Sequence, residues 1–192
     1  MATAILKEYK QPNIAQFCDV RSTIAIPFED IFKNYENVKT IRDEAVNINF
    51  KKQFIETAHK KQIFYDWLIT SAGSETNFFD IPGVKENSFE LKKVNDALNI
   101  RNSIDELFIS KGKREKINIV IGGGGFTGCE LGGELMCYLD NLAKVHKRPK
   151  DSFNVKIIEA SPEILGGASS WARKKAKKRL EKLGVQITLN NP

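Results

Sequence analysis

Short apolar runs alternate with helical apolar repeats along the second half of this chain. Runs rich in β-branched residues, which predict strands, occur at Ile117–Ile121, Asn154–Ile158 and Val185–Leu189. An amphipathic helical pattern follows each of the first two runs. This alternation predicts an α/β fold with a Rossmann-like parallel sheet. We expect the strand Ile117–Ile121 to be buried on both faces of the sheet, because its apolar residues barely alternate with polar ones.

The first half of the chain has shorter, less regular patterns. Helices are predicted at Phe28–Lys33, after a proline, and at Glu90–Phe108. Strand-like runs between them predict a small antiparallel meander, and these runs are Asn37–Ile41, Glu44–Ile48, Phe54–Ala58 and Tyr65–Thr70. Residues 1–20 carry little pattern. A polar, basic stretch at Ser110–Lys116 marks the expected boundary, which divides the chain into residues 1–112 and residues 113–192.

A glycine-rich turn connects the strand Ile117–Ile121 to the helix that follows it. Gly123, Gly125 and Gly128 form the pattern G-x-G-x-x-G. In a strand–turn–helix context the first glycine makes the turn, the second lets the backbone approach a pyrophosphate, and the third lets the helix pack closely on the strand. The N–H groups at the helix N-terminus favour phosphate as well. The alternative is a tight turn without a ligand.

The helix and the second strand strengthen the dinucleotide interpretation. Four leucines of the helix share one face, and they are Leu131, Leu135, Leu139 and Leu142. Glu159 ends the second strand, where an acidic residue binds the ribose of NAD. Glu159 lies 31 residues after Gly128, more than the usual ~20. A basic loop at Lys144–Lys150 accounts for the surplus.

Composition sets limits on the class of protein. The chain has 192 residues, a net charge of +6 and a pI of about 9.1, with 41% hydrophobic residues, which is typical of a globular protein. No apolar run reaches the ~20 residues that span a bilayer, and no signal peptide or metal site is predicted. Cys18, Cys129 and Cys137 have no C-x-x-C spacing, so we interpret them as reduced, packed thiols of a cytoplasmic protein.

Two basic clusters, Lys144–Lys150 and Arg173–Arg179, allow two interpretations. The second lies on the helix face opposite Ala172, Ala176 and Leu180. A solvated helix face is favoured over a nucleic-acid patch, because no aromatic interleaving or nucleic-acid motif accompanies it.

Together these segments resemble the type II NADH dehydrogenases, in the FAD-dependent pyridine nucleotide–disulfide oxidoreductase superfamily. The matching blocks keep the family's order and cover most of residues 24–190. They are Tyr65–Phe79 (YDWLITSAGSETNFF), Ile81–Gly83, Ala97–Asn102, Ile119–Leu135 (IVIGGGGFTGCELGGEL) and Val155–Leu165 (VKIIEASPEIL). Residues 1–20 carry little of the resemblance. A family member would have its own early G-x-G-x-x-G unit for FAD, a late Gly-Asp motif and C-terminal membrane-associating helices. The sequence contains none of these, so the chain resembles an internal fragment that alone would not hold FAD stoichiometrically.

The resemblance implies roles for individual residues. The NADH-binding residues would be Gly123, Gly124, Gly125, Phe126, Thr127 and Gly128, with Glu159 on the adenosine ribose. Because no arginine follows Glu159, NADH is favoured over NADPH. Glu130 matches a family glutamate near the nicotinamide and flavin rings, and its alternative is a first-turn residue facing the helix dipole. The FAD-binding residues would be Val46, Ser71, Ala72 and Gly73. The first domain, 1–112, would be a partial FAD domain, and 113–192 a partial NADH domain.

The implied reaction is hydride transfer from NADH to FAD and then reduction of a quinone. No redox-active cysteine pair is present, which argues against a disulfide reductase. The implied partners are the quinone, a membrane surface on the inner face of a membrane, and a homodimer, but no nucleic acid. Two alternatives stay open: a non-catalytic NAD(H)-binding module or remnant, and another FAD-dependent quinone-reducing flavoprotein such as a sulfide:quinone oxidoreductase.

Overall fold

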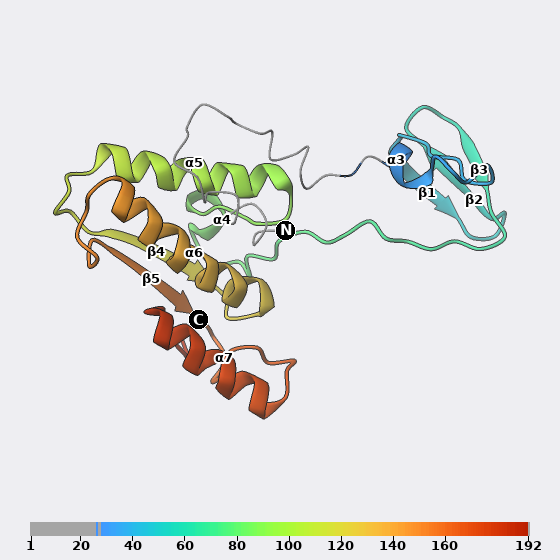
Figure 1. Ribbon diagram of the computed structural model, residues 1–192. Coiled ribbons are helices and arrows are strands. Elements are labelled where there is room, and N and C mark those ends of the chain that lie inside the picture. Colours follow the sequence, from blue (N-terminus) through green and yellow to red (C-terminus); the bar gives the residue numbers. More distant parts are fainter. Residues whose placement is uncertain (1–25, 27, 192) are drawn as a thin grey trace. The chain divides into compact units, whose positions relative to one another are not determined.

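The structure is a computed structural model that describes residue 26 and residues 28–191 (Figure 1). The described residues form two compact units, one ending at Glu75 and the other beginning at Thr76. The expectations for residues 1–20 and for Cys18 lie outside the described residues. Within those residues no helix is both long enough and apolar enough to cross a membrane.

The first unit contains a small antiparallel sheet. Its elements are helix α3 (Phe28–Phe32) and strands β1 (Ala45–Asn49), β2 (Phe54–Thr57) and β3 (Gln62–Phe64). The strands lie in the order β1-β2-β3, and both pairs are antiparallel. Phe54 is buried and contacts Phe64 at 5.6 Å between ring centroids. The predicted meander is therefore confirmed, with strands at Glu44–Ile48 and Phe54–Ala58.

Two strands predicted for the same unit are wrong. Asn37–Ile41 begins in a turn in which the Val38 N–H donates to the Tyr35 carbonyl. Tyr65–Thr70 bends at Asp66 and Trp67, and its backbone pairing stops at Tyr65, whose N–H donates to the Gln53 carbonyl at 2.9 Å. Trp67 is 92% exposed. Strand-like sequence becomes a strand only when another strand accepts its hydrogen bonds, and neither segment has such a neighbour among the described residues.

The second unit is a parallel sheet covered by helices. Its helices are α4 (Val84–Asn87), α5 (Val94–Ser110), α6 (Phe126–Val145) and α7 (Ser170–Leu183), and its strands are β4 (Ile117–Gly122), β5 (Phe153–Ile158) and β6 (Gln186–Thr188). The strand order is β4-β5-β6, with Ile121 beside Ile157 and Ile157 beside Ile187. Both β–α–β connections are present, so the predicted Rossmann-like α/β fold is confirmed.

Helix α6 supplies the largest part of the core. Leu135, Leu139 and Leu142 are fully or almost fully buried against Val155 and Ile157 of β5. The fourth predicted leucine, Leu131, is partly buried at the edge of this core. Burial of such side chains contributes roughly 1.5–3 kcal/mol each, so this face of α6 fixes the helix on the sheet.

Strand β4 is not buried on both faces, which corrects our expectation. Ile117 and Ile121 are 1% and 8% exposed, whereas Val120 is 59% exposed and Asn118 is exposed. Helices α6 and α7 pack against each other, and right-handed crossovers place both on one face of the sheet. On the other face, Asn118, Val120 and Gly122 of β4 are exposed, whereas the corresponding residues of β5 are partly buried.

Arg148 fastens helix α5 to the parallel unit. Its guanidinium is buried and donates to the carbonyls of Lys111, Gly112 and Glu115 at 2.7–2.9 Å. The guanidinium carbon also lies 5.4 Å from the ring centroid of Phe108. A residue in the predicted basic loop is therefore a structural contact. It ties the residues on both sides of the boundary expected after residue 112 to the same compact unit.

We predict that Arg148→Met lowers the free energy of unfolding by about 2–4 kcal/mol, because three partly buried backbone carbonyls lose a charged donor. Urea unfolding followed by circular dichroism measures this change. Lys150→Met is the control, since Lys150 is exposed, and its effect should stay within about 0.5 kcal/mol. Equal stability of the two variants would contradict the role assigned to Arg148.

Candidate dinucleotide-binding site

The glycine-rich loop begins with a left-handed residue at the end of β4. Gly123 has a φ of 98°, and its N–H donates to the Ile158 carbonyl at 2.8 Å. A side chain is strained at this φ whatever space surrounds it. The chain therefore turns sharply at Gly123 while staying tied to the end of β5.

Gly124 is buried where the loop meets the segment after β5. A Cβ there would lie 2.8 Å from Ile164 Cγ2 and 3.2 Å from Glu159 Cβ. Its N–H donates to Glu159 Oε2 at 2.5 Å, and its carbonyl accepts from the Leu165 N–H at 2.8 Å. Gly124 thus brings the ends of the first and second strands together.

Gly125 faces open space directly before helix α6. No atom lies within 4 Å of a Cβ built on it, and its φ of −71° suits any residue. The first helical hydrogen bond runs from the Cys129 N–H to the Gly125 carbonyl. No described residue accepts from the N–H groups of Phe126, Thr127 or Gly128. These three donors and the positive end of the helix dipole can therefore bind an anionic group.

Gly128 is required by the backbone itself. A Cβ at this position would lie 2.1 Å from the Gly123 carbonyl oxygen and 3.4 Å from Ile121 Cγ2. One turn later, a Cβ on Gly132 would lie 3.1 Å from Ile157 Cδ1. Close packing of helix on strand therefore uses two glycines, of which the G-x-G-x-x-G pattern predicted the first.

The Glu159 carboxylate organises the floor of the site. It accepts from the Ser161 N–H at 2.8 Å through Oε1 and from the Gly124 N–H through Oε2. These backbone N–H groups, Ser161 first, hold the pKa of Glu159 below its ordinary value. Each oxygen keeps a second lone pair. The carboxylate is therefore ionised at neutral pH and has acceptor capacity left for a hydroxyl group.

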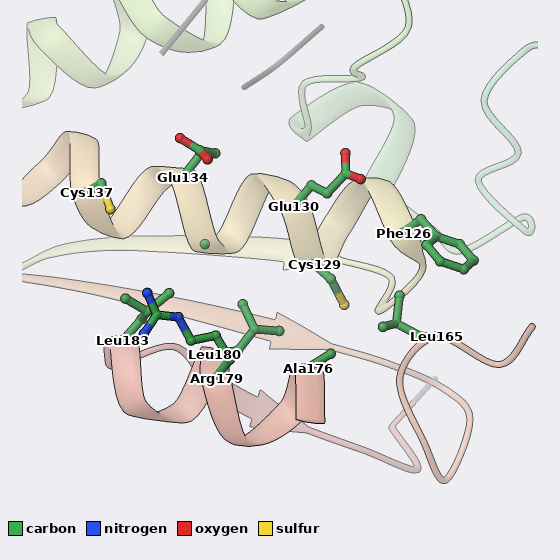
Figure 2. A pocket seen from close by; sticks show the side chains of 11 residues that line it. Phe126, Cys129, Glu130, Glu134, Cys137, Leu165, Ala176, Arg179, Leu180 and Leu183 are labelled. Atoms are coloured by element: carbon green, nitrogen blue, oxygen red, sulfur yellow. The ribbon is translucent and has the colours of Figure 1, made fainter. Parts of the chain in front are cut away.

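The remaining predicted site residues lie in two places. Glu130 is exposed on the first turn of α6 and is turned away from α7 (Figure 2). The predicted FAD-binding residues lie in the other compact unit, where all of them are exposed, and they are Val46, Ser71, Ala72 and Gly73. Gly73 has a φ of 81°, so the small-residue segment does contain a position that favours glycine.

Cys129 supports the loop from the helix side. It is buried, and its Sγ lies 3.4 Å from the Gly124 carbonyl oxygen, to which it donates. Burial, with smaller effects from Glu159 and Glu130, raises the pKa of this thiol to about 11. Cys129 is therefore an unreactive packing residue, as expected, whereas Cys137 is exposed, so the expectation that it is packed is wrong. Neither Gly132 nor Arg148 was singled out in the sequence. A glycine four residues after Gly128 on the same helix face was the available signal for Gly132.

A shallow cleft of about 480 Å³ lies between α6 and α7 (Figure 2). Its walls are mainly apolar, from residues such as Leu165, Leu180 and Leu183, with Arg179 at its rim. Phe126, at the start of α6, stands at one end and is 60% exposed. The cleft therefore adjoins the glycine-rich loop but does not contain its free N–H groups.

Comparison with known families identifies the architecture. The family described as pyridine nucleotide-disulphide oxidoreductase matches residues 1–191. The chain belongs to this family. The match spans both compact units, so the small meander and the parallel sheet are parts of one family pattern.

Individual relatives agree with this assignment. The chain is 31% identical over 172 residues to a type II NADH:quinone oxidoreductase of Staphylococcus haemolyticus, covering 86% of this chain and 42% of the relative. It is 31% identical over 151 residues to the external alternative NAD(P)H-ubiquinone oxidoreductase B2, mitochondrial, of Arabidopsis thaliana, covering 73% of this chain and 26% of the relative. The chain thus spans less than half the length of these curated relatives.

A solved structure shares the fold. NDH2 from Plasmodium falciparum in complex with NADH superposes with a TM-score of 0.66 at 22% identity, over 78% of this chain and 33% of that one. This likeness supports the fold class independently of the sequence comparisons.

We predict that Glu159→Gln lowers the melting temperature at neutral pH, because the amide NH₂ cannot accept from one of the two backbone N–H groups. The free energy of unfolding should fall by roughly 1 kcal/mol, since the carboxylate is partly solvated. A lowered folded-state pKa stabilises the fold above the unfolded pKa, and this contribution disappears as pH falls through the folded pKa. The difference between the two proteins should therefore shrink on acidification.

Melting curves over a series of acidic to neutral buffers provide the measurement. Glu134→Gln is the matched control, because the side-chain carboxylate of Glu134 forms no hydrogen bond or ion pair with a described residue. A pH-independent gap for Glu159→Gln would refute the role of the carboxylate charge.

Proposed function

We propose that residues 123–128 bind the pyrophosphate of NADH and that the chain is part of an NADH:quinone oxidoreductase. The observation that carries the proposal is the combination at the start of α6. Three N–H groups that no described residue accepts from follow Gly125. No atom lies within 4 Å of a Cβ built on Gly125. A pyrophosphate needs both donors and close access to the backbone.

Glu159 is proposed to hold the adenosine ribose and to select NADH. Its carboxylate is fixed by two backbone N–H groups and retains free lone pairs. A 2′-phosphate would meet a negative charge at this position, and no arginine follows in Ala160 or Ser161. The names of some relatives include NAD(P)H and so do not distinguish NADH from NADPH. The proposed selectivity for NADH therefore rests on Glu159.

FAD is the second cofactor that family membership supports. Val46 and the segment Ser71–Gly73 would approach it through their backbone, for which the small side chains and the left-handed Gly73 are suitable. The cofactors supply hydride and electron transfer when bound. The contribution of this chain is to bind and orient them, and Glu130 would face the reacting rings from the first turn of α6. In this scheme residues 1–112 serve FAD and residues 113–192 serve NADH.

Quinone is proposed as the electron acceptor because both relatives are named for quinone reduction. Attachment to the inner face of a membrane and formation of a homodimer are proposed with it. A non-catalytic NAD(H)-binding role is the second candidate, since the glycine-rich loop and Glu159 form a binding site within one compact unit. Bound flavin, measured by absorbance of the purified protein, separates the two roles.

We predict that Gly125→Ala leaves the melting temperature without ligand nearly unchanged, because its φ suits alanine and the surrounding space is open. The methyl group should occupy the space of the pyrophosphate. Saturating NADH should therefore raise the melting temperature of the unsubstituted chain, with stabilisation following RT ln(1 + [L]/Kd), but not that of the variant. A full NADH-induced shift in Gly125→Ala would remove the main support for the site.

Gly123→Ala gives the matched contrast. Its positive φ makes alanine strained, so we expect a loss of about 1 kcal/mol or more in stability without ligand. The two substitutions add the same methyl group two residues apart. If Gly123→Ala is as stable as the unsubstituted chain, the turn geometry assigned to the loop is wrong.

We predict that NADH binds this site at least tenfold more tightly than NADPH, and that Glu159→Ala weakens NADH by about 1–3 kcal/mol. Isothermal titration calorimetry measures both affinities. Reduced nicotinamide mononucleotide lacks the adenosine ribose, so its affinity separates the two roles of Glu159. Glu159→Ala should weaken its binding only if the substitution disturbs the glycine-rich loop. Equal affinities of the unsubstituted chain for NADH and NADPH would contradict the assignment.

A further inference from the structure

Helix α7 holds the whole net charge of the protein. Its 14 residues, SWARKKAKKRLEKL, contain seven lysines and arginines and one glutamate. The full chain has 30 basic and 24 acidic residues, so 23 of each are left outside α7. A chain that is otherwise neutral therefore carries a net charge of +6 on one short helix. Such concentration creates a local positive potential that a scattered surplus would not.

The charge is further concentrated on the side of α7 that faces solvent. Figure 2 shows Ala176, Leu180 and Leu183 on the side turned toward α6. The opposite side contains residues at spacings of three, four, seven and eleven, which share one helix face. These residues define the α7 basic face, which comprises Trp171, Lys174, Lys175, Lys178 and Lys182, all of them exposed.

Acidic residues do not neutralise this face. The ion pairs of the helix use other residues, Arg173 with Glu163 at 3.0 Å and Lys177 with Glu181 at 4.0 Å. None of the four lysines of the α7 basic face forms an ion pair with a described residue. Their ammonium groups are therefore available to an external anion.

Trp171 distinguishes this face from an ordinary solvated helix. The indole is 69% exposed, and the Lys175 Nζ lies 4.6 Å from its ring centroid. A large exposed aromatic ring among lysines is typical of a helix that lies at the headgroup level of a membrane. The indole suits this level because it has an apolar ring and a polar N–H group. Nucleic-acid sites favour arginine, whose planar fork matches phosphate, and the α7 basic face contains no arginine.

We propose that the α7 basic face docks on an anionic lipid bilayer surface, with the lysines on the headgroups and Trp171 inserted between them. The helix lies on the surface, because it is far too short and too polar to span it. The inference rests on the membrane attachment in the proposed function, to which it gives a surface, and the contact itself requires neither NADH nor a quinone. Each lysine near an anionic surface contributes about a fivefold gain in affinity, which makes the association salt-sensitive.

Flotation with phospholipid vesicles tests the proposal. The chain should bind vesicles of phosphatidylcholine with about one third phosphatidylglycerol, bind phosphatidylcholine alone weakly, and dissociate when salt is raised. Replacing Lys174, Lys175, Lys178 and Lys182 by glutamine should lower the affinity by at least about tenfold. The fold should be unaffected, because all four side chains are exposed.

A second quadruple variant controls for net charge. Lys51, Lys52, Lys60 and Lys61 are exposed lysines of the other compact unit, and their replacement by glutamine removes the same charge elsewhere. It should change the affinity less than about twofold. Equal losses in the two variants, or no binding to anionic vesicles by the unsubstituted chain, would overturn the proposal.

The fluorescence emission of Trp171 reports on insertion of its ring, which a purely electrostatic contact would not change. The chain has two tryptophans, so Trp67→Phe leaves Trp171 as the single reporter. Its emission should shift to the blue on anionic vesicles. Emission that stays unchanged would overturn insertion of the ring. A duplex DNA oligonucleotide that binds more tightly than the vesicles, and loses binding in the α7 variant, would assign the face to nucleic acid instead.

The test of the α7 basic face is separable from the test of the proposed dinucleotide site. The α7 quadruple variant should keep the full NADH-induced rise in melting temperature, because the α7 basic face contains no residue of the glycine-rich loop. Loss of vesicle binding with an intact NADH response concerns the α7 basic face, and the reverse result concerns the dinucleotide site.

Discussion

The close approach of helix α6 to the end of strand β4 is the constraint on which the site depends. A Cβ on Gly128 would lie 2.1 Å from the Gly123 carbonyl oxygen, so this helix can begin where it does only if residue 128 is glycine. The left-handed Gly123 turns the chain into this position. The free N–H groups of the helix consequently lie beside the strand end, at the edge of the sheet where parallel α/β folds bind ligands.

Glu159 connects this turn to the second strand. Its carboxylate joins the Gly124 N–H to the Ser161 N–H, and Leu165 adds a further hydrogen bond back to Gly124. The site is therefore built from two strand ends that are coupled through one acidic side chain. A residue expected to contact a ribose also supports the loop that would hold the pyrophosphate, so its substitution affects both contacts.

Local signals account for what the sequence predicts well. The turn Gly123–Gly128 and the strands Ile117–Ile121, Asn154–Ile158 and Val185–Leu189 depend on neighbouring residues, and the strand positions agree with the structure to within two residues. Long-range partners account for the errors. Tyr65–Thr70 has the alternation of a strand but no strand beside it among the described residues, and Val120 is apolar but exposed.

The roles of Arg148 and Gly132 also depend on residues that are distant in the sequence. Arg148 has the composition of a basic loop, and only the fold brings the carbonyls of Lys111, Gly112 and Glu115 around it. Gly132 is an ordinary helix residue until Ile157 of the neighbouring strand lies against it. The roles of Glu130 and of the FAD-binding residues come from family resemblance, and the structure adds their exposure and backbone conformation.

We propose that NADH binds the free backbone donors at the start of α6. Nitrogen-15 NMR of the labelled chain during titration with NADH tests it most directly, because each amide reports separately. We predict the largest shifts for Phe126, Thr127 and Gly128, with smaller ones near Glu159. Shifts confined to the cleft between α6 and α7, or saturable NADH binding that leaves these three amides unmoved, would contradict it.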